Sequence, residues 1–160
     1  MDNDDAAKMG NDDAAIKVLI DLTSLPLDIA VGAAFVASPT AGGLACFVGT
    51  TRGMTSSGIG VDRLEFEAHI PLARAELKRA VSAAQKAAKG VLVSVYIAHR
   101  LGSVSVGEAA VICWVSAPHR AEALEGVKFI IDALKARAPI WKKEVLVNGD
   151  ASWRANSECC

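Results

Sequence analysis

The residues best placed to do chemistry lie at positions 134–144, where four cations surround a proline and a tryptophan. Because proline cannot continue a helix, we expect Lys135 to lie in the last turn of one helix. Lys142 comes seven residues later, past the break, and should begin an extended segment. Two ammonium groups could therefore converge from two different elements and bind an anion. A lysine that is crowded by other cations or partly desolvated can also lose its proton and act as a base or nucleophile.

Other cationic positions could complete such an anion site. His119 and Arg120 stand at the expected start of the same helix, where free backbone N–H groups also attract anions. Arg52 follows an expected strand and precedes a glycine-rich loop at 53–60. Each position has a simpler alternative, because a lone histidine is more often a structural hydrogen-bonding group and an arginine often forms a surface salt bridge. The two lysines could likewise be solvated residues that complement a helix dipole.

The neighbours of Lys142 favour a chemical role over this alternative. Trp141 should anchor the start of the strand, so that Lys142 leaves from a rigid base, which suits catalysis. Glu144 could hold one of the adjacent lysines in place. By contrast, His99 and Arg100 stand at a strand end, where bracing a turn is the favoured interpretation.

Length and composition predict one globular domain over residues 15–154. The chain has 160 residues, of which 52% are hydrophobic and 22% charged, and a formal net charge of −1. Residues 1–13 carry five aspartates against one lysine, so we expect an acidic, disordered tail at 1–14 and a second short tail at 155–160. No secretory signal or membrane-spanning run is evident, which favours the cytosol.

The absence of several well-known motifs reduces the number of reaction classes that the sequence supports. The sequence lacks the glycine-rich nucleotide signatures, the Gly-x-Ser-x-Gly elbow and the Cys-x-x-Cys pair, so nucleotide, acyl-serine and zinc chemistries lose their usual signals. Cys46 and Cys113 lie in apolar runs and are expected to be buried, reduced thiols, and Cys159-Cys160 end the chain.

Hydrophobic periodicity predicts an α+β sandwich in which a mostly antiparallel sheet packs with two main helices. The expected final helix buries an apolar stripe that includes Leu124, and the link at 104–107 joins two antiparallel strands. The expected strands span 16–23, 44–48, 61–68, 91–98, 109–116 and 141–147, and the expected helices span 27–36, 71–90 and 120–136.

Five segments together resemble the large, catalytic subunit of molybdopterin synthase over about residues 16 to 154. The segment Pro-Ile-Trp-Lys-Lys-Glu is the most diagnostic of them. In chain order they are Phe47-Val48-Gly49-Thr50-Thr51-Arg52, Leu64-Glu65-Phe66-Glu67-Ala68, His99-Arg100-Leu101-Gly102 with Val106-Gly107-Glu108, Ser116-Ala117-Pro118-His119-Arg120, and Asp132 through Glu144.

The resemblance implies an α/β hammerhead fold and a homodimer, the core of a heterotetramer, with a small ubiquitin-like sulfur-carrier subunit docked at each end. Such enzymes are sulfurtransferases of molybdenum cofactor biosynthesis. They build the dithiolene of molybdopterin on cyclic pyranopterin monophosphate, using sulfur delivered as a thiocarboxylate on the carrier's C-terminal Gly-Gly tail. No metal or organic cofactor is implied.

The resemblance also implies roles for individual residues. Lys135 and Lys142 match the family's catalytic pair, and they would also contact the substrate. In this family the pocket draws on both protomers. The remaining substrate-binding positions would be Arg52, His119, Arg120, Lys143 and Glu144.

Two other classes of function stay open from the residues alone. A non-enzymatic adaptor could bind a ubiquitin-like tail or a phosphorylated ligand through the same cations, and only turnover would distinguish it from an enzyme. Nucleic-acid binding is poorly supported, because 5% aromatic residues and a net charge of −1 offer neither stacking platforms nor a broad basic face.

Overall fold

The computed structural model describes residues 16–154. The acidic segment expected to be disordered, the short tail at 155–160 and the pair Cys159-Cys160 lie outside the described residues. Among residues 16–154, no helix combines the length and the apolar character needed to cross a bilayer.

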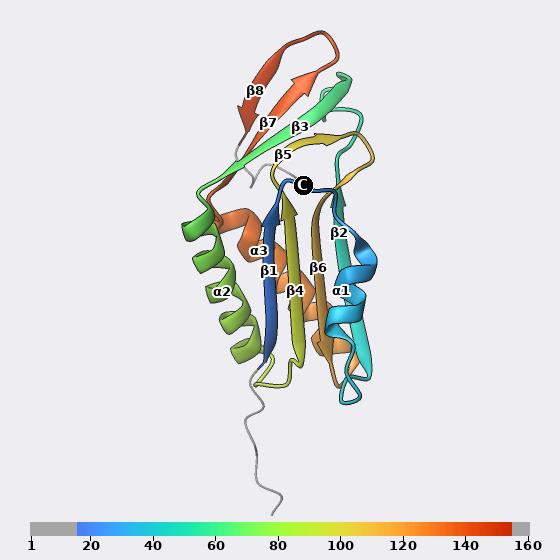
Figure 1. Ribbon diagram of the computed structural model, residues 1–160, viewed down its shortest axis with the longest axis vertical. Coiled ribbons are helices and arrows are strands. Elements are labelled where there is room, and N and C mark those ends of the chain that lie inside the picture. Colours follow the sequence, from blue (N-terminus) through green and yellow to red (C-terminus); the bar gives the residue numbers. More distant parts are fainter. Residues whose placement is uncertain (1–15, 155–160) are drawn as a thin grey trace, which may run out of the picture.

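A four-stranded sheet forms the body of the molecule, with the strand order β1-β4-β6-β2 (Figure 1). Its strands are β1 (Lys17–Thr23), β4 (Ser94–Arg100), β6 (Ala109–Ala117) and β2 (Gly43–Thr50). β1 pairs with β4 in parallel, and the other two pairings are antiparallel. The expected antiparallel pairing of the two strands in the second half of the chain is therefore confirmed. β4 is covered on both faces, which explains its almost uninterrupted run of buried residues.

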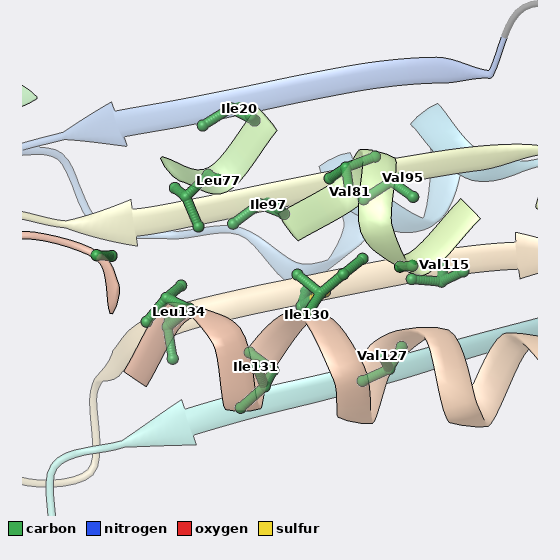
Figure 2. Packing of buried hydrophobic residues seen from close by; sticks show 14 of the residues in the cluster. Ile20, Leu77, Val81, Val95, Ile97, Val115, Val127, Ile130, Ile131 and Leu134 are labelled. Carbon is green, nitrogen blue, oxygen red and sulfur yellow. The ribbon is translucent and has the colours of Figure 1, made fainter. Parts of the chain in front are cut away.

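Helices cover both faces of this sheet. α2 (Ile70–Ala87) and α3 (Arg120–Arg137) pack together on one face, and the short α1 (Ile29–Val36) covers the other (Figure 1). Side chains from α2 and α3 interdigitate with those of the strands to form the main core (Figure 2). Leu77, Ile97 and Ile130 are fully buried in it, and each such side chain contributes about 1.5–3 kcal/mol by leaving water.

A second sheet crosses one end of the first, with the order β5-β3-β7-β8 (Figure 1). Its strands are β5 (Gly102–Ser105), β3 (Val61–Ala68), β7 (Ile140–Leu146) and β8 (Ala151–Arg154), and every pairing is antiparallel. The two mostly antiparallel sheets, with helices packed on the larger one, confirm the predicted α+β class.

His99 joins the two sheets. This residue of β4 is 2% exposed, and its ring packs edge-on against Phe66 of β3 with ring centroids 4.9 Å apart. Its Nδ1 is 2.8 Å from the carbonyl oxygen of Arg100, so the neutral ring donates a hydrogen bond to its own strand. The Arg100 guanidinium in turn binds Glu108 Oε2 at 2.9 Å, and the same oxygen accepts the N–H of Ser105. The expectation that this pair braces a turn is confirmed.

The structure differs from the expected elements at three places. The strand expected at 91–98 begins at Ser94, because the Gln85 side chain binds the backbone of Gly90 and Leu92 and holds that segment against the end of α2. The expected link at 104–107 belongs partly to β5, and the polar end contains β8. Both of these strands have only four residues, and such short edge strands are stabilised by their partners more than by their own sequence.

Burial of His99 predicts an acid-sensitive fold. Removal from water lowers the pKa of His99 to about 4, although its hydrogen bond to Arg100 opposes this. In the unfolded chain the imidazole takes up a proton below about pH 6.5, while in the folded chain it stays neutral. The contribution of His99 to the free energy of unfolding should therefore be fully present above pH 6.5. It should fall as the pH drops from 6.5 to 4, by at most about 3 kcal/mol.

Urea unfolding across this pH range measures the effect. A His99→Gln variant should show a flatter profile between pH 6.5 and 4 than the unmodified protein, whatever its absolute stability. His119→Gln, which changes an exposed histidine, should keep the original profile. A His99→Gln profile as steep as that of the original protein would contradict the assignment.

Candidate active site

Pro139 separates the two predicted lysines as expected. α3 ends at Arg137, and Ala138 adopts an extended backbone with φ −67° and ψ 128°, so the chain leaves the helix and enters β7 within two residues. Lys135 therefore lies in the last turn of α3, and Lys142 lies near the start of β7. Both elements meet at the end of the molecule that carries the second sheet (Figure 1).

Lys142 is a buried cation, with only 3% of its surface exposed. Its Nζ lies 3.5 Å from Glu144 Oε1, and the Glu144 side chain is itself only 20% exposed. Residues two apart in a strand share a face, so the two charged side chains lie on the same face of β7 as the buried Ile140. The predicted role of Glu144, which is to hold one of the lysines, matches this contact.

Lys143 lies on the opposite, outer face of β7. Its Nζ is 3.4 Å from Glu65 Oε2 in the neighbouring β3, and it approaches the ring of Trp153 in β8. The hydrogen bond from Arg63, and secondarily the charge of Lys143, hold the pKa of Glu65 below its ordinary value. Lys143 and Lys142 therefore do not share a pocket within one chain.

Lys135 lines a groove between α3 and β2 with a volume of about 310 Å³. Phe47 and Cys46 form its β2 side, while Leu124 and Ile131 belong to its α3 side. The predicted burial of Leu124 is wrong, since this side chain is 61% exposed. Gly126, by contrast, lies close against the sheet, where an added Cβ would come within 3.1 Å of Val115.

The cysteine prediction is half right. Cys113 is buried, and burial raises the pKa of its thiol. Cys46 is exposed at the groove, although partial burial raises its pKa as well. Both thiols are free, and no group of three or more potential metal ligands occurs within residues 16–154.

Arg52 lies at the same end of the molecule as Lys135. β2 runs toward the second sheet, and Arg52 follows it as an exposed residue just before the loop. The loop is ordered by its own hydrogen bonds, in which Thr55 N donates to the Ile59 carbonyl at 2.8 Å and Val61 N donates to Gly53 at 3.0 Å. Thr51, next to Arg52, is buried and bonds the carbonyl of Val104.

His119 and Arg120 lie at the other end of α3. His119 is the residue before the helix, and its side chain makes no capping hydrogen bond. Fifteen residues of helix separate Arg120 from Lys135, which corresponds to about 22 Å along the axis. Within one chain the structure therefore divides the predicted site into two groups, with Arg52, Lys135, Lys142 and Glu144 toward one end and His119 with Arg120 at the other.

Comparison with known proteins shows to which family the chain belongs. The family described as MoaE protein matches residues 22–137. The molybdopterin synthase catalytic subunit of Bos taurus is 43% identical over 143 residues, which cover 89% of this chain and 74% of that protein. The chain belongs to the MoaE family.

Solved structures agree with this assignment. Molybdopterin synthase from Staphylococcus aureus superposes with a TM-score of 0.78 at 28% identity, covering 84% of this chain and 95% of that one. A complex of subunits 1 and 2 of molybdopterin-converting factor from Helicobacter pylori contains a chain of the same fold, with a TM-score of 0.65 and 23% identity over 88% of this chain and 90% of that one. The resemblance found in the sequence is thus confirmed, and the fold is that of the MoaE structures.

The positioning residues of this MoaE chain could not all be found from sequence. The alternation of apolar and charged residues along β3 puts Phe66 on the apolar face of the strand, but its contact with His99 and its register opposite Lys142 needed the structure. β8 had no predictive signal of its own, yet it flanks β7 and places Arg154 opposite Lys142.

The alternation along β7 predicts unequal effects of two adjacent substitutions. Lys142→Ala removes buried packing and leaves Glu144 without the ammonium beside it, so we expect a loss of about 3 kcal/mol in the free energy of unfolding. Lys143→Ala removes a half-exposed ion pair and should cost less than about 1 kcal/mol. Chemical denaturation of both variants measures the difference, and equal losses would show that the faces are assigned wrongly.

Proposed function

We propose that this chain is the catalytic subunit of a molybdopterin synthase, a sulfurtransferase of molybdenum cofactor biosynthesis. It would convert cyclic pyranopterin monophosphate into molybdopterin with sulfur from the thiocarboxylate of a small ubiquitin-like carrier. Family membership and the named relatives support this function. The free thiols of Cys46 and Cys113 favour the cytosol as its compartment.

The observation that carries the proposal is the buried Lys142 beside Glu144. Two apolar residues at positions 142 and 144 would fill this space at lower free-energy cost, because desolvating two charges can outweigh their attraction. A retained ammonium in such a place supports a chemical role. In this role Lys142 and Lys135 stabilise the negative charge that develops as sulfur displaces oxygen, and they transfer protons to and from the leaving oxygen.

The remaining predicted residues fit a substrate that carries a phosphate. Arg52 follows β2 at the end of the molecule to which α3 and β7 also bring the lysines, and its guanidinium suits bidentate contact with phosphate. Glu144 holds Lys142 in place. Lys143 lies on the outer face of β7, so it would line a surface formed together with another chain and not the cavity that contains Lys142.

The separation of His119 and Arg120 from Lys135 supports a site shared between two copies. A single chain holds these groups about 22 Å apart along α3, which is too far for one small substrate to contact both. A twofold-related copy can place the start of its α3 against the lysine end of the first, because such an interface repeats each contact twice. We therefore propose that His119 and Arg120 act on the substrate bound mainly by the other protomer.

The second partner would be the sulfur carrier. Its extended C-terminal tail must reach the lysines, and the groove between α3 and β2, which Lys135 lines, is one open approach. The related Helicobacter pylori protein forms a complex of its subunits 1 and 2. The proposed assembly has a homodimeric core and one carrier at each end.

Loss of either lysine should abolish turnover. In an assay with thiocarboxylated carrier and the pterin precursor, Lys135→Ala and Lys142→Met should each lower dithiolene formation by at least about 100-fold, because charge stabilisation in a desolvated site is worth several kcal/mol. Methionine is chosen at position 142 to keep the packing. The matched control is Lys89→Ala, which removes an exposed lysine just past α2 at the far end of the molecule.

Carrier binding distinguishes the enzyme from the adaptor. Lys135→Ala should still bind the carrier in a pull-down while product formation fails. Unchanged product formation in both lysine variants would refute the proposed function, and the adaptor would then be the better account.

Mixed dimers test whether the site is shared. Lys135→Ala and Arg120→Ala protomers, each inactive alone, should regain about one quarter of the original activity after unfolding and refolding together, because half of the dimers then contain one intact site of two. Refolding Lys135→Ala with Lys142→Met should restore nothing, since both changes lie on the same protomer's side. Absence of recovery in the first mixture would place all of these residues in one chain's site.

A further inference from the structure

A second groove, unrelated to the proposed site, lies between β1 and α2 and has a volume of about 680 Å³. Figure 1 shows these two elements side by side along one flank of the larger sheet. The floor of the groove is apolar and its rim is cationic. Its defining residues are Ile16, Val18 and Ile20 from the β1 side and Arg74, Lys78 and Lys86 from α2.

β1 presents an open backbone edge to this groove. It is the outermost strand of its sheet and pairs only with β4 among residues 16–154. Arg74 Nη1 donates to the carbonyl of Ile20 at 2.7 Å, so the backbone groups of Ile20 face outward. Backbone groups alternate along a strand, and Val18 therefore faces the same way, whereas Lys17 N donates inward to Val93 at 3.2 Å. Such an edge readily accepts another extended segment.

The positive charge of the groove favours an acidic segment as its occupant. Arg74 and Lys78 lie one turn apart on α2, Lys86 follows two turns later on the same side, and no acidic residue lines the groove. The floor between them includes Val18 and Val81. The best occupant is therefore an extended, acidic segment with small apolar side chains.

Residues 1–15 of the same chain have this character and join the structure at the groove. They contain five aspartates against one lysine, and the apolar residues Ala6, Ala7 and Met9 interrupt the charges. The next described residue, Ile16, already lines the groove.

We propose that residues 1–15 of this chain occupy the groove, with their aspartates against the cationic rim. Fifteen residues can reach about 50 Å, and the groove from Arg74 to Lys86 is about 18 Å long, so the length suffices. The acidic segment thus covers an edge that would otherwise be open to pairing between molecules.

Amide hydrogen exchange of Val18 in the full chain tests the proposal. Reversing the rim with Lys78→Glu and Lys86→Glu should speed exchange at Val18 about tenfold, because the acidic segment then leaves the groove more often. The inward-facing amide of Lys17 should not change. Lys89→Glu is the matched control, since it removes the same charge near the end of α2 but outside the groove lining.

A charge swap supplies the reciprocal test. Combining the reversed rim with Asp4→Lys, Asp5→Lys, Asp12→Lys and Asp13→Lys should restore slow exchange at Val18, and about 1 M salt should weaken protection in the original chain, since the Debye length is then about 3 Å. Protection that is unchanged by rim reversal would overturn the proposal. Protection that disappears on dilution would also overturn it, because the occupant would then be a second copy.

Discussion

The arrangement of the end of the molecule that carries Lys135 and Lys142 depends on the break at Pro139. An 18-residue helix on the face of one sheet is followed, within two residues, by a strand of the other sheet. Without this stop, α3 would continue past the end of the sheet and β7 could not pair with β3. The break therefore places a helix-borne lysine and a strand-borne lysine at one end of the fold, and it does so through a steric property of the backbone rather than through any attraction between the two cations.

A neutral aromatic contact also fixes the position of the two sheets relative to each other. His99 and Phe66 meet edge to face between β4 and β3, and Phe66 is opposite Lys142 in the ladder. Because the imidazole is buried and uncharged, the interface beside Lys142 gains no further cation.

Sequence predicted the elements with strong patterns and missed those without them. β3 alternates apolar and charged residues, α2 and α3 carry long apolar stripes, and Pro139 marks a sharp boundary, so each was predicted within about three residues. β5 and β8 are short and polar, and only their pairing partners define them. The burial of Lys142 was likewise beyond the local pattern, since the residue types at 141–144 alternate only weakly and the second sheet decides which face is covered.

For the site itself, the sequence pointed to the residue types and the resemblance implied their roles, but neither gave their distribution in space. A helix of fixed rise separates Arg120 from Lys135 by a distance that follows from their numbers alone. What could not be derived from one chain is whether a neighbouring copy closes that distance, because surfaces that form only between copies leave no periodic signal in the sequence.

Two identical side chains stand next to each other in β7 with opposite surroundings, and this raises the question of what keeps the strand from slipping. A shift by one position would exchange one ammonium for another, so the lysines themselves cannot specify the alignment of β7 with its neighbours. The alignment must instead be fixed by the two residues before them, Ile140 and Trp141. Ile140 is 2% exposed and Trp141 is 49% exposed, so a shift of the strand by one position would force the indole into the core. The bulky ring of Trp141 thus stabilises one alignment of β7 by making the shifted alignments sterically unfavourable.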